Sequence, residues 1–350
     1  MKTDPVNSEV TGCNQKKLPL PAHLSTPPVI AWPTLLLALL SCSWYGYTHF
    51  RYFYSGGITY QSALAQWFVA AYLCFTPTHD ATHDAVASSR AGKRLSKGIN
   101  AAVGRCCALP LCAPFYAFRF LHLQHHKYTN VVGKDPDLWS SLPPSLNSLM
   151  EASAMNSSSL QFVLGHLVVM IVMPFKWVTQ LYSYIFHYVR HRAERPTSEV
   201  IESYVMMLIQ VFYPLISLGL YGRESHAFWC YALPGYLAIG LLACSFDYLP
   251  HRPHGTTDIY QGTNLTALFS TTTNNRTGSR RSTSYITSPL TWPMLYQNYH
   301  VIHHLYPWIP FYRYSTVWTA LEEQLLDAGV PIVPLLPVGL PRSKVEKKKR

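Results

Sequence analysis

The stretch "ITYQSALAQWFVAAYLCFTPTHDATH", residues 58 to 83, joins an uncharged apolar segment to two histidines. Residues 58–77 contain no Asp, Glu, Lys or Arg, and they are long enough for the roughly 20 residues that cross the hydrocarbon core of a membrane. His79 and His83 follow four residues apart, so both rings share one face of a helix. The stretch therefore predicts a transmembrane helix that ends in a pair of possible metal ligands.

Three further uncharged segments have the same character, at residues 29–47, 203–221 and 227–246. Hydrophobic residues make up 49% of the chain and charged residues only 13%, about half the usual charged share of a soluble domain. Buried core helices of a soluble protein are the alternative, but such helices usually carry a polar face. We therefore expect an all-α integral membrane protein with four transmembrane helices.

Two other apolar segments do not resemble complete spans. Residues 98–118 contain an arginine and two prolines, and residues 160–175 are short and run into a basic stretch. A full fifth span would place the two later histidine motifs on opposite sides of the membrane. If these motifs serve one site, both segments are interfacial or re-entrant helices.

The distribution of positive charge predicts the orientation. Among the 28 lysines and arginines, only Arg51 and Arg223 fall on the side of the membrane opposite the histidines. By the positive-inside rule, the histidine side faces the cytosol or stroma. Because no signal peptide is recognisable before the first span, we expect that span to remain as an anchor.

Three parts of the chain are expected. Residues 1–28 form a polar N-terminal arm, residues 29–330 form a single membrane domain, and residues 331–350 form a basic C-terminal tail. Within the membrane domain, the Ser/Thr/Asn-rich stretch at about 254–291 has the composition of a flexible loop.

The spacing H-x-x-H-H occurs twice, in "HLQHH" (residues 122–126) and in "HVIHH" (residues 300–304). "DYLPH" adds His251 at the end of the fourth span. Together with the first pair these make nine imidazoles at the cytosolic edge: His79, His83, His122, His125, His126, His251, His300, His303 and His304. A catalytic zinc needs about three protein ligands, so nine indicate two metals. Imidazole suits iron, copper and zinc, and the spacing alone does not identify the metal.

Several polar residues are candidates to orient the ligand rings by accepting their second N–H. They are Asp80, Asp84, Asp135, Asp137, Asp247 and Asn298. Asp135 and Asp137 are equally well explained as turn formers around Pro136, and Asp247 could instead reach a metal-bound water.

The other histidines and the cysteines have simpler explanations. His166, His187, His191 and His226 are isolated from the motifs, so we expect structural or interfacial roles for them. The eight cysteines include no C-x-x-C pair, and we expect them to act as small buried hydrophobes.

"HDATH", "HLQHH" and "HVIHH" resemble the three histidine boxes of the membrane fatty-acid-desaturase superfamily, over about residues 75 to 318. More specifically, "FDYLPHRP" (246–253), "HLQHHKYTN" with "KDPD" (122–137) and "QNYHVIHHLYPWIPFYRY" (297–314) resemble the β-carotene hydroxylases of the cyanobacterial type. This resemblance implies a di-iron centre with His251 completing the ligand set. It also implies O2 as co-substrate and electrons from an external donor. The expected reaction is hydroxylation of the β-ionone rings of β-carotene, which gives cryptoxanthin and zeaxanthin.

Other functions remain open at this point. The long stretch between "LPHRP" and "QNYH", and "VGKDPD", resemble carotenoid ketolases, and acyl-lipid desaturases or hydroxylases use the same boxes. A non-enzymatic metal-binding or transport protein would carry polar or ionisable residues within its spans, and these spans have almost none. "QNYH" and "DYLPHRP" favour the hydroxylase.

The expected partners follow from this assignment. They are a carotenoid or other lipid from the bilayer, a ferredoxin or cytochrome-b5-like electron donor, and membrane lipids, but no nucleic acid. The net charge of +11 suits an acidic donor or anionic headgroups, and it is equally explained as a solvated positive-inside face. The terminal "KVEKKKR" resembles a dilysine retrieval signal, so we expect either a thylakoid or plastid membrane or the endoplasmic reticulum.

Overall fold

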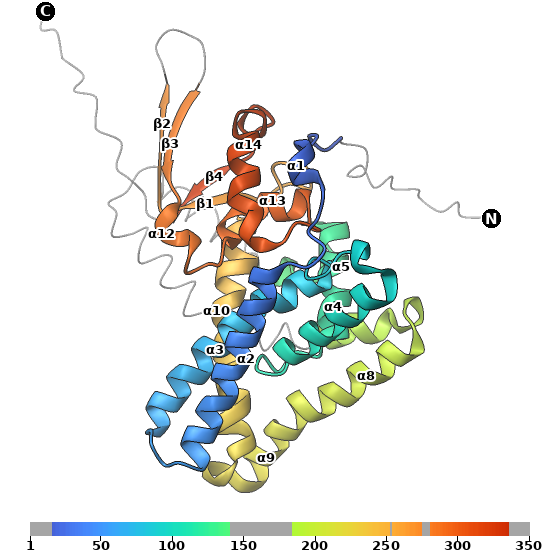
Figure 1. The fold of residues 1–350 in the computed structure, drawn as a ribbon, viewed down its shortest axis with the longest axis vertical. Coiled ribbons are helices and arrows are strands. Elements are labelled where there is room, and N and C mark those ends of the chain that lie inside the picture. The colour runs from blue at the N-terminus through green and yellow to red at the C-terminus, as the bar shows by residue number, and fades with distance from the viewer. Residues whose placement is uncertain (1–15, 141–183, 253, 275–280, 336–350) are drawn as a thin grey trace, which may run out of the picture.

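The protein is mostly helical, and its long helices lie below a smaller cap of short helices and strands (Figure 1). The computed structural model describes residues 16–140, 184–252, 254–274 and 281–335. The longer helices below the cap are α2 (Trp32–Phe53), α3 (Tyr60–Thr82), α4 (Lys93–Ala108), α5 (Phe115–Tyr128), α8 (Thr197–Met207), α9 (Tyr213–Tyr221) and α10 (Leu233–Leu242). The cap contains α1 (Ala22–Ser25), α12 (Ser288–Thr291), α13 (His300–Leu305) and α14 (Tyr314–Asp327).

Short turns connect these helices. Residues 184–190 are helical, and single 3₁₀ turns occur at Ser89–Ala91, Leu138–Ser140, Arg192–Glu194, Gly222–Glu224, Gln297–Tyr299 and Phe311–Arg313. The short helix α11 (Leu249–His251) continues the stretch that contains α10 and ends at a predicted ligand.

Helices α2 and α3 pack against each other and cover the first two predicted spans. α2 has Pro33 in its first turn, where the missing N–H leaves no hydrogen bond unmade. α3 is capped by Thr59, whose hydroxyl accepts a hydrogen bond from the backbone N–H of Ser62 at 3.3 Å. Ala63 and Ala70 on α3 are fully buried, and such small side chains let neighbouring helices approach closely.

The other two predicted spans lie in continuous helical stretches, Thr197–Glu224 and Ala227–His251. Among the helices that the structure describes, these two are long and apolar enough to cross a membrane, judged by length and composition. Wide π turns occur at Leu208–Phe212, Ala227–Ala232 and Ala243–Tyr248, and each is followed by a helix with proline in its first turn: Pro214, Pro234 and Pro250. Because a proline ring clashes with the carbonyl of the preceding turn, widening that turn lets the helix continue.

The prediction of four spans is therefore supported in part. α2 and α3 are long enough to cross a membrane, but unlike the two later stretches they are not apolar enough to be identified as spans by their mean hydropathy. Residues 98–118 do not form one helix, because α4 ends at Ala108 and α5 begins at Phe115, with Pro110 and Pro114 between them. The predicted interfacial segment 160–175 lies outside the described residues.

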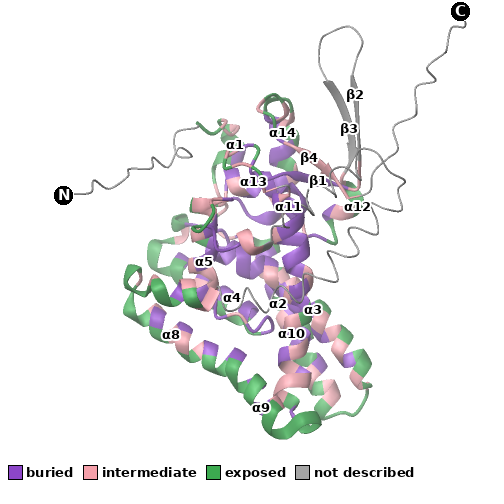
Figure 2. Ribbon diagram, turned by 180° about the vertical axis from the view of Figure 1, so that it is seen from behind, coloured by how far each residue is buried: buried purple, intermediate pink, exposed green. Residues whose placement is uncertain are grey.

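Apolar side chains point outward on the lower helices. Leu36 and Leu40 on α2 are more than half exposed, as are Ile209 and Ile216 in the 197–224 stretch. Figure 2 shows the buried residues concentrated toward the centre and the exposed ones along the outer helices. A lipid bilayer would cover apolar surface of this extent.

The segment expected to be a flexible loop, 254–291, forms strands instead. β2 (Phe269–Asn274) and β3 (Arg281–Ile286) pair antiparallel, with Phe269 opposite Ile286. β1 (Leu265–Ala267) pairs parallel with β4 (Ile332–Pro334), so the beginning of the predicted basic tail belongs to the cap. The loop prediction relied on polar composition and overlooked that β-branched threonine favours extended backbone.

The cap has its own apolar core. Tyr314, Trp318 and Leu321 of α14 are buried against Ile302 and Leu305 of α13. The described part of the N-terminal arm also contacts this core. The hydroxyl of the buried Tyr306 donates a hydrogen bond to the carbonyl of Leu18 at 2.7 Å. This packing positions α13, the helix that carries the last histidine motif.

The cysteines agree largely with expectation. Among the described residues they form no disulfide, and most are buried. Cys42, Cys74 and Cys107 meet between α2, α3 and α4, with the Cys42 sulfur 3.9 Å from that of Cys74 and 3.6 Å from that of Cys107. Cys106 differs from the prediction because it is exposed.

Candidate metal centre

All nine predicted histidines converge at the junction between the helices and the cap. They come from α3 and its C-cap, α5, α11 and α13, which are far apart in the sequence. Their ring nitrogens form two groups of four with one histidine between them.

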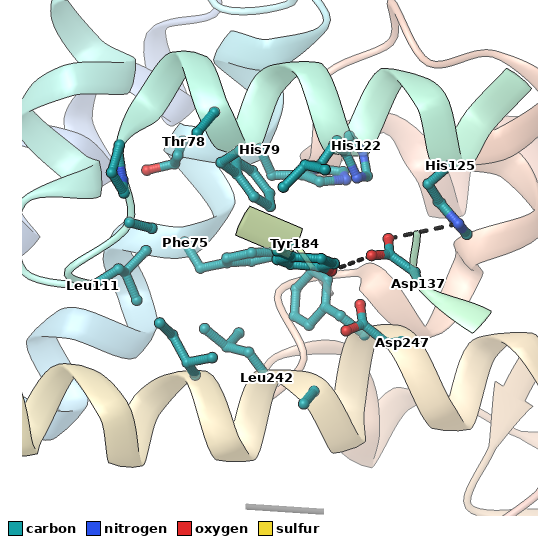
Figure 3. Close-up of a pocket in the computed structure, with 18 of the residues that line it drawn as sticks. Phe75, Thr78, His79, Leu111, His122, His125, Asp137, Tyr184, Leu242 and Asp247 are labelled. Carbon is teal, nitrogen blue, oxygen red and sulfur yellow. Dashed lines mark hydrogen bonds and ion pairs between the residues drawn. The ribbon is translucent and has the colours of Figure 1, made fainter. Parts of the chain in front are cut away.

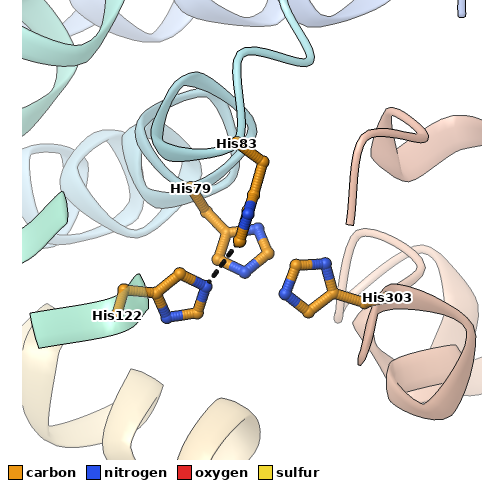
Figure 4. Close-up of side chains that lie close together, drawn as sticks. All are labelled: His79, His83, His122 and His303. Atoms are coloured by element: carbon orange, nitrogen blue, oxygen red, sulfur yellow. Dashed lines mark hydrogen bonds between the residues drawn. The ribbon is translucent and has the colours of Figure 1, made fainter. Parts of the chain in front are cut away.

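The first cluster consists of His79, His83, His122 and His303 (Figure 4). Each offers one ring nitrogen, and these four atoms lie within 4.8 Å of one another. The Nε2 atoms of His83 and His122 are 2.9 Å apart.

The second cluster consists of His125, His251, His300 and His304. The Nε2 atom of His304 lies 3.3 Å from that of His125 and 3.2 Å from that of His300. The Nε2 atom of His251 lies 3.0 Å from that of His300. His251 thereby joins the ring set from a separate helix, as its position at the end of the fourth predicted span suggested.

His126 lies between the clusters. Its Nε2 is 3.1 Å from Nε2 of His122 and 2.7 Å from Nε2 of His303, both in the first cluster. Its ring also stacks on His304 of the second cluster, with centroids 4.2 Å apart. It is therefore placed to serve either cluster.

Helix geometry explains why the H-x-x-H-H motif occurs twice. Residues three and four positions apart lie on neighbouring parts of one helical face, so one motif can supply two adjacent sites. On α5, His122 faces the first cluster and His125 the second. On α13, His303 faces the first cluster, and His300 with His304 the second. Each motif is divided between the two sites.

The nitrogen contacts fit metal ligation better than hydrogen bonding. His83, His122, His126 and His303 form a chain of three Nε2–Nε2 contacts of 2.7 to 3.1 Å. Each Nε2 of a neutral ring either donates one hydrogen or accepts, so three such contacts in a row cannot all be hydrogen bonds. Ligand nitrogens about 2.1 Å from one tetrahedral ion lie about 3.4 Å apart, so the rings need to separate by only a few tenths of an ångström to bind one.

Orphaned nitrogens support the same interpretation. Within the described part of the chain, both ring nitrogens of His79 are buried without a hydrogen-bond partner. Buried polar atoms in native proteins are nearly always paired, and a metal ion in the first cluster would satisfy the His79 nitrogen that faces its centre.

Burial keeps most of these rings neutral. It lowers the pKa well below the usual histidine value at His83, His122, His126, His300, His303 and His304. A neutral imidazole has a lone pair for a metal. At His125 burial also lowers the pKa, but the carboxylates of Asp135 and Asp137 outweigh this and raise the pKa to about 9.

Asp135 orients a ligand ring. Its Oδ1 lies 2.8 Å from Nδ1 of His125, so the ring can donate there and direct Nε2 to the second cluster. Asp135 also accepts hydrogen bonds from the backbone N–H groups of Asn130 at 2.6 Å and Asp137 at 2.9 Å. It is therefore both a ring partner and a turn former, the two roles that the sequence left equally open.

Asp137 and Asp247 lie close to the rings without a short bond to them. Asp137 approaches Nδ1 of His125 at 3.5 Å and accepts a hydrogen bond from the hydroxyl of Tyr184 (Figure 3). Asp247 lines the same cavity, below Asp137 in this view.

Three other candidates have different partners from those expected. Asp80 accepts hydrogen bonds from the hydroxyl of Thr34 at 2.9 Å and from the backbone N–H of Phe311 at 3.3 Å. It therefore links α3 to α2 and to the cap. Asp84 forms an ion pair with Arg119 at 3.1 Å. Asn298 donates to Thr291 at 3.5 Å. Sequence proximity to a ligand does not determine which way these side chains point.

Two partners of ligand rings were not predicted. The Tyr314 hydroxyl lies 3.0 Å from Nδ1 of His303, and the Thr129 hydroxyl lies 3.4 Å from Nδ1 of His304. Thr129 is in the "HLQHHKYTN" stretch and Tyr314 ends the "QNYHVIHHLYPWIPFYRY" stretch, but neither residue was predicted to contact a ligand ring.

An apolar cavity leads to both clusters (Figure 3). It has a volume of about 140 Å³. Phe75, Leu111 and Leu242 line it, and His122 and His125 lie on one side of it. An apolar ligand in this cavity would meet imidazole rings of both clusters at one wall.

The histidines for which structural or interfacial roles were predicted lie outside the two clusters wherever the structure describes them. His187 and His191 stack with ring centroids 4.5 Å apart, and Nδ1 of His191 is 2.7 Å from a Glu194 carboxylate oxygen. His226 contacts the sulfur of Cys230. His166 lies outside the described residues.

Comparison with known proteins agrees with this arrangement. Residues 58–335 match the family model described as fatty acid desaturase, and the chain belongs to this family. A stretch of 48 residues is 42% identical to the sn-1 oleoyl-lipid 12-desaturase of Picosynechococcus sp. (strain ATCC 27264 / PCC 7002 / PR-6), and it covers 14% of this chain and 14% of that protein. Family membership and the histidine clusters indicate an oxidoreductase, and together with the two apolar helices they indicate a membrane protein.

Proposed function

We propose that this member of the fatty acid desaturase family is a membrane di-iron oxygenase that hydroxylates the β-ionone rings of β-carotene. The observation that carries the proposal is the apolar cavity of about 140 Å³ whose wall includes imidazole rings of both clusters. A substrate with an unactivated C–H bond and no polar group suits such a cavity.

The two clusters would each hold one iron ion, and the nine histidines are the proposed ligands. His79, His83, His122 and His303 would hold the first ion, and His125, His251, His300 and His304 the second. His126, which lies between the clusters, would bind one of the two ions. An iron pair supplies the capacity to use O2 and two electrons to oxidise a C–H bond. The overall reaction consumes the substrate, O2, two electrons and two protons, and it gives the alcohol and water.

The protein itself would supply positioning. Asp135 fixes the orientation of the His125 ring, and Tyr314 does the same for His303. Phe75, Leu111 and Leu242 exclude water from the cavity and hold an apolar chain against the rings. Asp137 and Asp247 are the acidic groups on the cavity wall, where they could interact with a polar group of the product.

The carotenoid assignment rests on particular residues. "FDYLPHRP" covers α11 with His251, and "QNYHVIHH" covers α13 with its three ligands. These stretches resemble carotenoid hydroxylases, and they form much of the second cluster. Aromatic side chains at Phe75 and Phe246 also line the cavity, which suits a conjugated polyene.

A second candidate is an acyl-lipid desaturase. It is favoured by the family match and by the relative that shares 42% identity over 48 residues, which is an oleoyl-lipid desaturase. The same clusters would then act on a fatty acyl chain, with formation of a double bond in place of a hydroxyl group.

Electrons would come from outside the chain. We propose a ferredoxin or a cytochrome-b5-like protein, because the chain is basic, with a net charge of +11, and such donors are acidic. Lys127 and Lys134 lie on either side of the loop that follows the second histidine motif, close to the site.

The proposed topology has four spans with the metal centre on the cytosolic or stromal side, in a thylakoid, plastid or endoplasmic reticulum membrane. A membrane-impermeant thiol reagent tests it on two variants, Ser55→Cys in the loop between α2 and α3 and Val132→Cys after α5. The proposal requires labelling of these two sites from opposite sides of the membrane. Labelling from the same side would contradict it.

The function is tested by expressing the chain in a bacterium that accumulates β-carotene, together with a ferredoxin and its reductase. Pigments and fatty acids are identified by chromatography and mass, and His303→Ala serves as the inactive control. Cryptoxanthin and zeaxanthin would support the proposal. Echinenone or canthaxanthin would indicate ketolation, and a new double bond in the fatty acids, with β-carotene unchanged, would favour the desaturase.

A further inference from the structure

Asn264 lies between the two elements that carry the second cluster. It is fully buried and directly precedes β1, and it follows α11 by thirteen residues. It is not a ring partner, and its own neighbours in sequence are not metal ligands. Its contacts nevertheless lead to His251 on one side and to His300 on the other.

The amide of Asn264 holds the turn that contains His251. Its Nδ2 donates to the carbonyl of Leu249 at 2.8 Å and to the carbonyl of Arg252 at 3.1 Å. Its backbone N–H donates to the carbonyl of Pro250 at 2.8 Å. The carbonyls at the end of a helix have no partner within the helix, and here one residue satisfies three of them around His251.

The same residue holds the start of α13. Its carbonyl accepts from the backbone N–H of Val301 at 3.3 Å, one residue after His300. The first N–H groups of a helix likewise have no partner within it. His251 and His300 are thereby fixed on two sides of one asparagine, and their Nε2 atoms lie 3.0 Å apart.

Asn264 is itself held rigidly. Its Oδ1 accepts from the hydroxyl of Thr266 at 2.8 Å, and both residues are buried. The following residue, Leu265, donates its N–H to the carbonyl of Pro331, which begins the parallel pairing of β1 with β4. Through Asn264, β1 therefore fixes both ligand-bearing turns relative to the cap.

We infer that Asn264 is a positioning residue for the second metal site, which it assembles by clasping α11 to α13. This inference rests on the proposed function, in which each cluster holds one metal ion. The first cluster depends on this clasp less, because His79, His83 and His122 come from α3 and α5. Its one ring from α13, His303, is also held by Tyr314. Loss of Asn264 should therefore affect the second site selectively.

Asn264→Asp is the sharpest test. Aspartate has nearly the same shape but no N–H groups, so the carbonyls of Leu249 and Arg252 lose their donor and face a carboxylate instead. Groups hydrogen-bonded directly to ligand rings change metal affinity by roughly 10- to 100-fold, and Asn264 acts less directly, through the backbone around His251. We therefore expect a roughly tenfold loss at the second site, the lower end of this range, and little change at the first.

Asn100→Asp is the matched control. Asn100 is almost fully buried, and its Nδ2 donates to the carbonyls of Ala87 at 2.8 Å and Ser96 at 2.9 Å. The same substitution there removes the same number of donors from α4 and from the loop after α3, and neither element carries a ring of the second cluster. A general effect of burying a carboxylate would appear in both variants.

The measurement is the iron bound per folded chain after anaerobic loading with ferrous iron, combined with the electron paramagnetic resonance spectrum of the nitric oxide adduct. Asn264→Asp should bind about half the iron of the unmodified chain and show the signal of an isolated ferrous ion, whereas Asn100→Asp should retain the coupled pair. Full occupancy of both sites in Asn264→Asp would overturn the inference. Equal loss from both sites, or the same loss in Asn100→Asp, would also overturn it, because the role would then be merely structural.

Two further results keep the test interpretable. If the unmodified chain binds no metal pair, the proposed function fails, and the inference that rests on it fails with it. If Asn264→Asp does not fold, Thr266→Val replaces it, since this change only frees the Oδ1 of Asn264 and leaves its donors in place. It should lower second-site affinity in the same direction by a smaller factor, and unchanged affinity would count against the inference.

Discussion

Replacing Asp135 with asparagine should weaken the second metal site and leave the first intact. The Oδ1 of Asp135 accepts from Nδ1 of His125 at 2.8 Å and from the N–H of Asp137 at 2.9 Å, and its Oδ2 accepts from the N–H of Asn130 at 2.6 Å. An asparagine has one carbonyl oxygen and one NH2 group, so it cannot accept all three hydrogen bonds. In its better orientation the oxygen keeps the first two, and the N–H of Asn130 faces the NH2 group.

The magnitude follows from these contacts. One buried N–H without a partner costs about 1–3 kcal/mol of folding free energy. The ring of His125 keeps a neutral hydrogen bond but loses a charged acceptor, and such outer partners change metal affinity by roughly 10- to 100-fold. We therefore expect Asp135→Asn to fold but to unfold at a lower denaturant concentration than the unmodified chain. It should bind the second ion about 10- to 100-fold more weakly.

Asp84→Asn is the control, because Asp84 also follows a histidine motif and has the same chemistry. Its side chain is 46% exposed and pairs with Arg119, an arrangement worth about 0–1 kcal/mol. Metal-depleted protein in detergent is titrated anaerobically with ferrous iron against a chelator of known affinity. Equal losses in the two variants, or unchanged affinity in Asp135→Asn, would refute the reasoning.

Three more changes test the site and its surroundings. His303→Ala removes a ring of the first cluster that also contacts His126, so turnover should be abolished and bound iron should fall, and full activity would be incompatible with the proposed ligands. Ala243→Phe places an aromatic ring in the cavity, where overpacking costs about 1–3 kcal/mol. Product formation should fall sharply while the iron content stays constant, and unchanged turnover would show that substrate does not use this cavity. Tyr314→Phe removes the partner 3.0 Å from Nδ1 of His303, so the first site should bind iron roughly tenfold more weakly in the same titration, with the second site as internal reference.

Much of the metal centre was predictable because helix geometry converts sequence spacing into spatial direction. His79 and His83 are four residues apart, and the two H-x-x-H-H motifs place three rings on neighbouring parts of a helical face. The structure brings all nine of these histidines together, including His251 from a separate helix. Local spacing therefore identified eight of these histidines, and the end of the fourth predicted span identified His251.

Elements governed by backbone pairing were harder to predict. The segment 254–291 has the polar composition of a loop, yet it contains β1, β2 and β3. The partner of β1 is Ile332–Pro334, more than sixty residues later, in the part expected to be a tail. Pairing between distant segments depends on where the cap places them, which local composition does not encode.

The sequence by itself determined which rings form the centre and that the rings of one motif lie on neighbouring parts of a helical face, because the i, i+3 and i+4 periodicity is a property of one helix. Only the tertiary structure decided how the rings divide into two clusters and which side chains orient them. Asp135 reaches His125, Asp84 turns away to Arg119, and Asn264 clasps two distant turns. These choices depend on contacts between different elements, and no periodicity along the chain specifies such contacts.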